Sequence, residues 1–262
     1  MTEQAVEIEV AGSVAWIWMS RPAVHNACDE ALIEQLTAAF LHLAKQPIRV
    51  IILAGRGANF SAGADIGWMK RQGMATTEAN LADARLLARL FDTIAKSTTS
   101  TIARVHGKAL GAGVGLIAAC DIAIGSNDAS LGLPEVRLGL IPATIAPYVV
   151  HAIGERHARR FFQTGERIDA ATAERIGLLH QVVPPDDLDR QIETIISSLL
   201  AGAPQAQAEA KTLIDAVANQ PISPELIEAT VQMIAHRRAQ PEAREGLSAF
   251  LEKRTAAWVP KR

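Results

Sequence analysis

The sequence predicts an α/β core followed by a largely helical C-terminal region. Strand-like and helix-like segments alternate over the first half of the chain, which favours parallel strands joined by helical crossovers. The segment IRVIILAG forms a continuous apolar strand of the kind that is buried on both faces of a parallel sheet. From about Ala152 the strand patterns give way to helical periodicity.

The chain opens with a predicted β-hairpin over residues 6–19. Val6, Ile8 and Val10 alternate with polar residues, a turn follows at Gly12, and VAWIWM returns as the second strand. After the loop SRPAVHNACD, Asp29 is a suitable N-cap for a helix. The apolar face of this helix contains Leu32, Leu36, Phe40 and Leu43, and Pro47 is expected to end it.

The next elements repeat one order of strand, Gly/Ala-rich loop and helix. IILAGRGANFSAGAD leads into a helical region that contains Trp68 and Phe91, and the strand Thr101–Val105 leads into HGKALGAG. Two copies of this order suggest a repeated structural unit. The apolar segment after the second loop is expected to be a helix, and CDIAIGS is expected to be a strand.

The C-terminal part is expected to be strand-poor. Helical periodicity covers residues 154–180, and VVPPDDLDR separates it from further helices at 187–201, 204–219, 224–239 and 241–257. We therefore divide the chain into an α/β core, residues 1–195, and a C-terminal helical region, residues 196–262. No low-complexity linker separates the two parts, so we expect them to pack together.

Composition favours a cytoplasmic globular protein. The 262 residues are 49% hydrophobic and 21% charged, and a net charge of −2 gives no electrostatic reason to expect nucleic acid as a partner. The two cysteines are too few for a disulfide scaffold and fit a reducing compartment. The acidic N-terminal segment lacks the features of a signal peptide, and no apolar run is long enough to cross a membrane.

The run from Gly107 to Pro142 contains the most distinctive residues of the chain. It begins with Gly111, Gly113 and Gly115, which follow a predicted strand and open a predicted helix. A dinucleotide-binding fingerprint would need its third glycine at the position of Leu116, so this interpretation is disfavoured. A phosphate-binding loop of the Walker type is excluded, because no Gly-Lys-Ser/Thr occurs.

The same glycines are compatible with a site for a negatively charged oxygen. A helix that starts near Ala112 points free backbone N–H groups, and the positive end of its dipole, at whatever lies in front of it. The loop FSAGAD offers a second N–H group, that of Ala64. Two converging N–H groups would form an oxyanion hole. The alternative is that both loops are simply close-packed turns between strand and helix.

Glu135 is the candidate acid–base residue. It lies in the apolar sequence LPEVRLGL, where loss of hydration should raise its pKa and suit proton transfer near neutral pH. The alternative is a structural glutamate, paired with a residue such as Arg137. The histidines show no metal-binding spacing, and Ser61 lacks the GxSxG pattern of a serine hydrolase.

FSAGAD, the run from Gly107 to Pro142, and TGERIDAATAERIGLLHQVVP together closely resemble the enoyl-CoA hydratase/isomerase (crotonase) superfamily. The resemblance extends over nearly the whole chain. It implies a superhelix of repeated ββα units, a C-terminal helical region that builds homotrimers or dimers of trimers, and an acyl-CoA ligand. The thioester oxygen would lie between the N–H groups of Ala64 and Ala112. The resemblance implies no metal and no redox cofactor, since coenzyme A is part of the substrate.

The resemblance also implies a set of residues around the ligand, with one departure from the usual pattern. Well-known hydratases carry one glutamate where this chain has Gly115 and a second at Glu135, so only one of the two acids is present. The segment IPATIAPYVV is also unusual and brings Thr144 and Tyr148 towards the expected acyl pocket. The implied substrate-binding residues are Ala23, His25, Ala27, Ala62, Asp65, Ile66, Gly67, Gly111, Gly115, Pro134, Thr144 and Tyr148.

Three functions remain open from the sequence. Glu135 alone could transfer both protons in the addition of water to an enoyl-CoA, or it could move a proton between C4 and C2 in a double-bond isomerase. A non-catalytic member that binds acyl-CoA or RNA is the third possibility. The segments ADIGWMKRQG and NLADARLLARLF resemble a bacterial branch that hydrates 3-methylglutaconyl-CoA in leucine or acyclic terpene breakdown. In that case Lys70, Arg71 or Arg85 would be candidates to pair with the distal carboxylate of the substrate.

Overall fold

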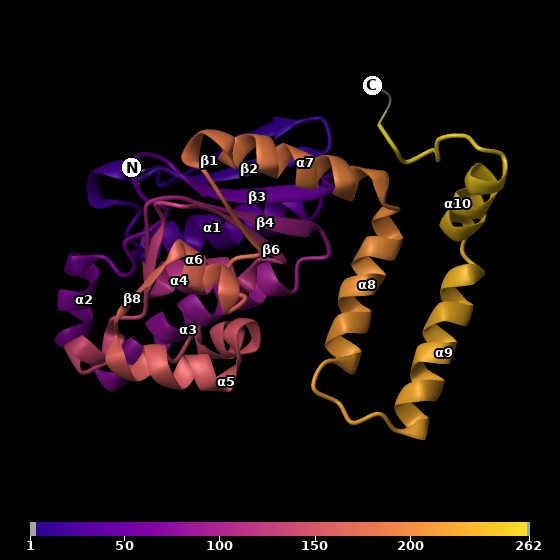
Figure 1. The fold of residues 1–262 in the computed structure, drawn as a ribbon. Coiled ribbons are helices and arrows are strands. Elements are labelled where there is room, and N and C mark those ends of the chain that lie inside the picture. Colours follow the sequence, from indigo (N-terminus) through magenta and orange to yellow (C-terminus); the bar gives the residue numbers. More distant parts are fainter. Residues whose placement is uncertain (1–3, 261–262) are drawn as a thin grey trace.

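A computed structural model describes residues 4–260 of the chain. The first three residues of the acidic N-terminal segment, and Lys261 and Arg262, lie outside the described residues. Figure 1 shows an α/β body from which the last three helices extend to one side. Among the described residues, no helix combines the length and the apolar character that a membrane span requires.

The body is built around a six-stranded sheet with the order β1-β2-β3-β4-β6-β9. The predicted hairpin is confirmed: β1 pairs antiparallel with β2 around a turn at Gly12, whose φ is 60°. All other neighbours in this sheet are parallel, as the alternation of strands and helices predicted. The strands are β1 (Val6–Ala11), β2 (Val14–Met19), β3 (Val50–Gly55), β4 (Ser100–Val105), β6 (Ile122–Ser126) and β9 (Gln181–Val183).

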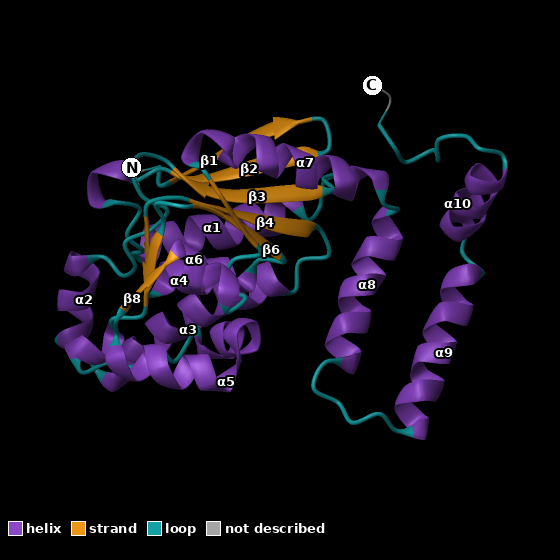
Figure 2. Cartoon of the chain, viewed as in Figure 1, coloured by secondary structure: helices purple, strands orange, loops and turns teal. Residues whose placement is uncertain are grey.

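The sheet lies between two helical layers, which Figure 2 shows as purple helices on both sides of the orange strands. Strand β3 is buried along its whole length, as predicted for IRVIILAG. Its Ile51 and Leu53 join the larger core, while Val50 and Ile52 face the smaller core beneath α7 (Leu188–Ala201). Each such side chain contributes about 1.5–3 kcal/mol when it is fully buried. The larger core is covered by α1 (Glu30–Leu43), α3 (Thr77–Ala95), α4 (Ala112–Ala119) and α5 (Ala146–Thr164).

A second, three-stranded sheet contains β5 (Lys108–Leu110), β7 (Ser130–Gly132) and β8 (Arg167–Asp169). Strand β5 pairs parallel with β7, and a bridge joins Ser61 to Ala109 of β5. Consecutive units of the chain therefore place one strand in the large sheet, a short strand or bridge in the small sheet, and then a helix. This arrangement confirms the crotonase-like fold of repeated ββα units that the resemblance implied. It brings the Gly/Ala-rich loops of two units to the same place.

The predicted helical region that contains Trp68 and Phe91 is confirmed and consists of two helices, α2 (Ile66–Gly73) and α3, because the Thr76 side chain accepts from the Ala79 N–H and starts a new helix. The helical prediction over residues 154–180 was wrong. Residues 154–180 are not one helix, since α5 begins earlier, bends at Gly154 and ends before Gly165, which has a φ of 58°. Strand β8, α6 (Ala170–Arg175) and β9 follow, so the region is less strand-poor than predicted.

The C-terminal helices are α7, α8 (Pro204–Val217), α9 (Pro224–Arg238) and α10 (Pro241–Leu251), the last of which is shorter than predicted. Helix α7 runs across residues 195 and 196, where we divided the chain, and it packs on the large sheet. Polar contacts join α8 and the end of α7 to the body. Lys211 forms an ion pair of 2.8 Å with Asp121, and the Arg49 guanidinium donates to the carbonyls of Leu199 and Leu200 at the end of α7.

Candidate active site

Two Gly/Ala-rich loops meet backbone against backbone: residues 60–65, and residues 110–111 where the chain enters the first turn of α4. Gly63 has a φ of 90°, and a Cβ at this position would lie 2.8 Å from the carbonyl oxygen of Leu110. Gly111 has a φ of 48° and a ψ of −115°, a conformation that side chains disfavour. Only glycine allows this approach and this turn at the start of α4. Gly63 is therefore required by the packing of the two segments, and Gly111 by the turn that leads into α4.

The backbone N–H groups of Ala64 and Ala112 are not used by the fold. A parallel bridge between Cys28 and Ala64 uses the backbone groups on either side of Ala64. The Cys28 N–H donates to the Gly63 carbonyl at 2.6 Å, and the Asp65 N–H donates to the Cys28 carbonyl at 2.8 Å. Ala112 is the first residue of α4, where an N–H has no partner within the helix. Over residues 4–260 neither N–H donates a hydrogen bond. Both can therefore donate to a ligand oxygen.

Glu135 lies beside this pair of loops. Its Oε1 is 3.0 Å from the point where a Cβ of Gly111 would stand, so the carboxyl group contacts the residue that precedes Ala112. Its Oε2 is buried and has no hydrogen-bond partner among the described residues. Burial raises the pKa of Glu135, and a hydrogen bond from its own backbone opposes this to a smaller extent. A desolvated carboxyl group without a charged partner can accept and return a proton.

Arg137 does not pair with Glu135. The Arg137 side chain is exposed and donates to the Thr164 carbonyl at 3.4 Å, and no ion pair joins it to Glu135 within the described chain. The 3-10 helix Glu135–Leu138, η2, ends at Gly139, and the Glu135 carbonyl accepts from Leu140 at 3.0 Å. The backbone of Glu135 is thus held in place while its side chain stays without a charged partner.

Gly115 faces an apolar wall. A Cβ at this position would lie 2.2 Å from Cγ2 of Ile145 and 2.9 Å from Cε1 of Phe91. Both side chains are fully or almost fully buried. Ile145 thus occupies the space that any side chain at position 115 would enter. Nothing in the sequence indicated that Ile145 or Phe91 faces Gly115, although Ile145 lies within the unusual segment IPATIAPYVV.

The loop with the predicted substrate-binding residues Ala23, His25 and Ala27 lies next to the first Gly/Ala-rich loop. The Ala62 N–H donates to the His25 carbonyl at 2.9 Å, and the Asn59 amide lies 3.0 Å from the His25 ring. Ala23 and His25 are exposed, whereas Ala27 is buried. Ala62 is half-buried, so part of its surface is also accessible.

The remaining predicted residues divide into two groups. Ile66, Gly67, Pro134 and Thr144 are exposed or half-buried near the loops or the η2 segment that carries Glu135. Asp65 has a structural role, since its carboxylate accepts from the Trp68 N–H at 3.1 Å and caps α2. The Tyr148 ring packs on Phe91 with 5.8 Å between centroids, and its pKa is raised by burial and by the nearby charge of Asp92. The Tyr148 hydroxyl therefore lies near the end of α3.

Three further observations limit what the site can be. Ser61 is fully buried and its hydroxyl donates to the Asn26 carbonyl at 2.8 Å, so it is not placed as a nucleophile. Over the described residues, no group of three or more His, Cys, Asp or Glu side chains could hold a metal ion. Arg71 pairs with Glu30 at 2.7 Å, whereas Lys70 and Arg85 are exposed.

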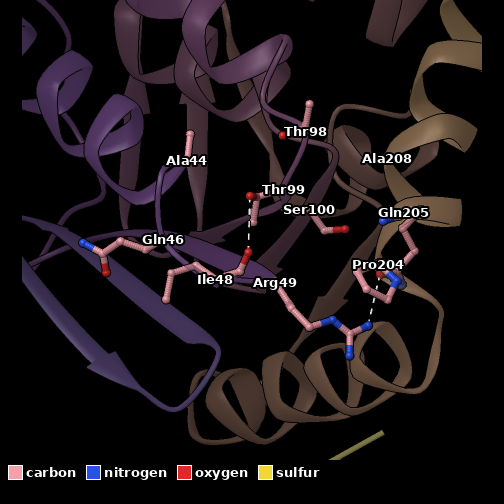
Figure 3. Close-up of a pocket in the computed structure, with 11 residues that line it drawn as sticks. Ala44, Gln46, Ile48, Arg49, Thr98, Thr99, Ser100, Pro204, Gln205 and Ala208 are labelled. Atoms are coloured by element: carbon pink, nitrogen blue, oxygen red, sulfur yellow. Dashed lines mark hydrogen bonds between the residues drawn. The ribbon is translucent and has the colours of Figure 1, made fainter. Parts of the chain in front are cut away.

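A cavity of about 230 Å³ lies away from these loops, between the end of α1, the start of β4 and the start of α8 (Figure 3). Its lining includes Arg49, Thr99 and Gln205, and it contains none of the predicted site residues. The Thr99 hydroxyl donates to the Ile48 carbonyl at 3.5 Å across this region, as the dashed line in Figure 3 shows. The cavity lies at the junction of the body with α8.

Comparison with known proteins agrees with the geometry. The sequence model of the enoyl-CoA hydratase/isomerase family matches residues 9–261. The 2,3-dehydroadipyl-CoA hydratase of Escherichia coli is 31% identical over 244 residues, which cover 92% of this chain and 93% of that protein. The crystal structure of an enoyl-CoA hydratase from Shewanella pealeana has a TM-score of 0.95 at 40% identity and covers 98% of this chain and 97% of that one. An enoyl-CoA hydratase structure from Mycobacterium smegmatis has a TM-score of 0.91 at 30% identity, with coverage of 98% and 99%. The chain therefore belongs to the enoyl-CoA hydratase/isomerase family.

Proposed function

We propose that the protein adds water to the 2,3 double bond of an enoyl-CoA thioester. The observation that carries this proposal is the buried, unpartnered Oε2 of Glu135, on a carboxyl group that contacts Gly111. Gly111 precedes the unused N–H of Ala112, so an acid–base group and a hydrogen-bond donor lie next to each other. Family membership supports an acyl-CoA thioester as the ligand.

In the proposed reaction, the thioester oxygen accepts hydrogen bonds from the N–H groups of Ala64 and Ala112. Glu135 takes a proton from water while the water oxygen bonds to C3, and the electron pair of the double bond moves towards the thioester oxygen as an enolate. The two N–H groups and the N-terminus of α4 stabilise this developing negative charge. Glu135 then returns the proton to C2, the enolate collapses, and the 3-hydroxyacyl thioester leaves.

The wall at position 115 supports a mechanism with a single acid. Ile145 and Phe91 occupy the space in front of Gly115, so no second carboxylate acts from that side. One carboxyl group can act first as base and then as acid in the same turnover. The raised pKa of Glu135 brings its two protonation states closer in free energy near neutral pH, which suits both steps.

For the acyl group we propose a branched glutaconyl thioester such as 3-methylglutaconyl-CoA. The similar Escherichia coli protein is named for a dicarboxylic thioester, which supports a substrate with a distal carboxylate. Without a second acid at position 115, the site repels such a substrate less. Lys70 and Arg85 are exposed and are candidates to pair with the distal carboxylate, whereas Arg71 already pairs with Glu30.

A double-bond isomerase is the second candidate, because the same single-acid geometry is sufficient to move a proton between C4 and C2. One experiment separates the two functions. Purified protein is incubated with 2-enoyl-, 3-enoyl- and 3-methylglutaconyl-CoA, and each product is analysed by mass spectrometry. A gain of about 18 mass units, the mass of one water, identifies hydration. Conversion of the 3-enoyl substrate without a change of mass would identify an isomerase, and no conversion of any substrate would refute both.

We further propose a homotrimer, or a dimer of trimers, built by the C-terminal helices. Ile227, Val231 and Ile234 lie along one face of α9 and are 48–53% exposed. Phe250 and Leu251 at the end of α10 are 81% and 77% exposed. Apolar faces of this kind are usually covered by a partner. Light scattering should give three or six times the chain mass of 28.0 kDa. The variant Val231→Asp should lower it, whereas Gln232→Asp, on another side of the helix, should not.

A further inference from the structure

We propose that Ser61 is a positioning residue that holds the two halves of the oxyanion hole at a fixed separation. Ser61 is fully buried and does not touch the space in front of Ala64 and Ala112 that a thioester would enter. Its hydrogen bonds nevertheless reach each segment that carries one of the two N–H groups. The proposal rests on the proposed function, since it concerns the same pair of donors.

The Ser61 hydroxyl holds the first half. It donates to the Asn26 carbonyl at 2.8 Å and accepts from the Gly63 N–H at 3.3 Å. Gly63 directly precedes Ala64, and its carbonyl accepts from the Cys28 N–H at 2.6 Å. The orientation of the Gly63–Ala64 peptide group, which contains the Ala64 N–H, is therefore determined in part by one hydroxyl group.

The Ser61 backbone holds the second half. Its N–H donates to the Lys108 carbonyl at 3.0 Å, and its carbonyl accepts from the Leu110 N–H at 2.9 Å. These bonds attach the residues immediately before Gly111 and Ala112. A Cβ at Gly113 would lie 2.9 Å from the Ser61 carbonyl oxygen and 3.0 Å from its Cβ, so the first turn of α4 rests directly on Ser61.

Loss of the hydroxyl should displace one donor relative to the other. Without it, the Gly63 N–H and the Asn26 carbonyl lose the side-chain partner that now satisfies them in a buried region, and the loop must shift to find other partners. An oxyanion hole acts only when its donors are in position before the reaction. A small displacement therefore weakens transition-state binding more than ground-state binding, and it should lower kcat more than it raises KM.

The test compares Ser61→Ala with Ser126→Ala. Ser126 is also fully buried, and its hydroxyl is bonded to Asp128 outside the site, so the control removes an equally buried hydroxyl. Two quantities are measured for each protein: kcat and KM with the enoyl-CoA that the wild type hydrates, and the carbonyl stretch of bound [1-13C]butyryl-CoA by difference infrared spectroscopy. Butyryl-CoA has no double bond to hydrate, so the band reports hydrogen bonding to the thioester oxygen alone.

We expect Ser61→Ala to lower kcat by about 10-fold or more and to keep KM within about 3-fold of the wild-type value. This is the effect expected when a hydrogen-bond donor is misplaced and not removed. Its carbonyl band should move back towards that of free butyryl-CoA, while Ser126→Ala should keep the wild-type band and kcat. A purely structural role would lower the melting temperature of Ser61→Ala and leave the band and kcat unchanged, which would overturn the inference.

A second variant covers the case in which Ser61→Ala does not fold. Gly113→Ala keeps the hydroxyl but places a methyl group against Ser61, so it should separate the loops and give the same change in kcat and in the carbonyl band. Wild-type values of both in Gly113→Ala would contradict the inference. If the wild type itself shows no shift of the bound carbonyl band, the proposed oxyanion hole fails, and this inference fails with it.

Discussion

Adding a single methyl group at Gly115 tests whether Ile145 fills the space that faces this glycine. In Gly115→Ala the new Cβ would lie 2.2 Å from Cγ2 of Ile145 and 2.9 Å from Cε1 of Phe91. Carbon atoms prefer separations of about 3.5–4.0 Å, so the first contact is short by roughly 1.3 Å (3.5 minus 2.2). Overpacking of this kind costs about 1–3 kcal/mol, and we expect the upper end because both neighbours are buried.

For a chain of this size, about 3 kcal/mol corresponds to a fall in melting temperature of roughly 6–12 °C. The assay is thermal unfolding, followed by circular dichroism or calorimetry. Gly73→Ala is the matched control, since a Cβ at the end of α2 would meet no atom within 4 Å, and alanine favours a helix. If Gly115→Ala melts within about 1 °C of both the wild type and the control, Ile145 does not fill the space that faces Gly115. A larger residue has still less room, so Gly115→Glu alone should not increase hydration of crotonyl-CoA.

Three further predictions concern charge and anchoring. Because burial raises the pKa of Glu135, the rate of hydration should increase with pH through a value above its usual 4.5, measured as the pH profile of kcat/KM; a profile with its acidic limb at or below 4.5 would contradict this. A carboxyl group whose pKa is raised by folding stabilises the fold while it is protonated, and this contribution is lost as pH rises through the raised pKa. At neutral pH the buried carboxylate therefore costs stability, so Glu135→Gln should melt about 1–3 °C above the wild type, and the difference should shrink in acid. Replacing Lys211 by methionine removes its partly buried ion pair with Asp121 and should cost about 1–3 kcal/mol in chemical unfolding. Lys96→Met breaks an exposed pair with Asp92 and should leave the unfolding midpoint close to that of the wild type.

The residues of the candidate site could be predicted where their signal is local. The glycines at 111, 113 and 115, the alanine after each loop glycine, and an acid in an apolar context are all visible in short segments. Positive φ at Gly63 and Gly111 explains why these segments need glycine. The desolvation of Glu135 followed from its apolar neighbours and agrees with its raised pKa.

What the sequence could not predict depends on contacts between distant residues. Gly115 and Ile145 are thirty residues apart, and nothing in either local pattern indicates that they touch. Ser61 could be assessed only as a nucleophile, because its bond to Asn26 depends on how two loops that are distant in the sequence come together. Strand β8 was missed since Arg167–Asp169 is only three residues long and lies between two helical patterns, while its pairing with β7 is long-range.

The central claim is that one carboxyl group, Glu135, performs both proton transfers of the hydration. The most direct measurement is the rate at which the wild type and Glu135→Gln convert the same enoyl-CoA into a product heavier by one water, followed by mass spectrometry. Glutamine keeps the shape of the side chain and cannot exchange a proton, so this account predicts a loss of about 10²–10⁴-fold in kcat with unchanged binding of butyryl-CoA. Hydration by Glu135→Gln at more than about a tenth of the wild-type rate would contradict it, because another group would then have to move the protons.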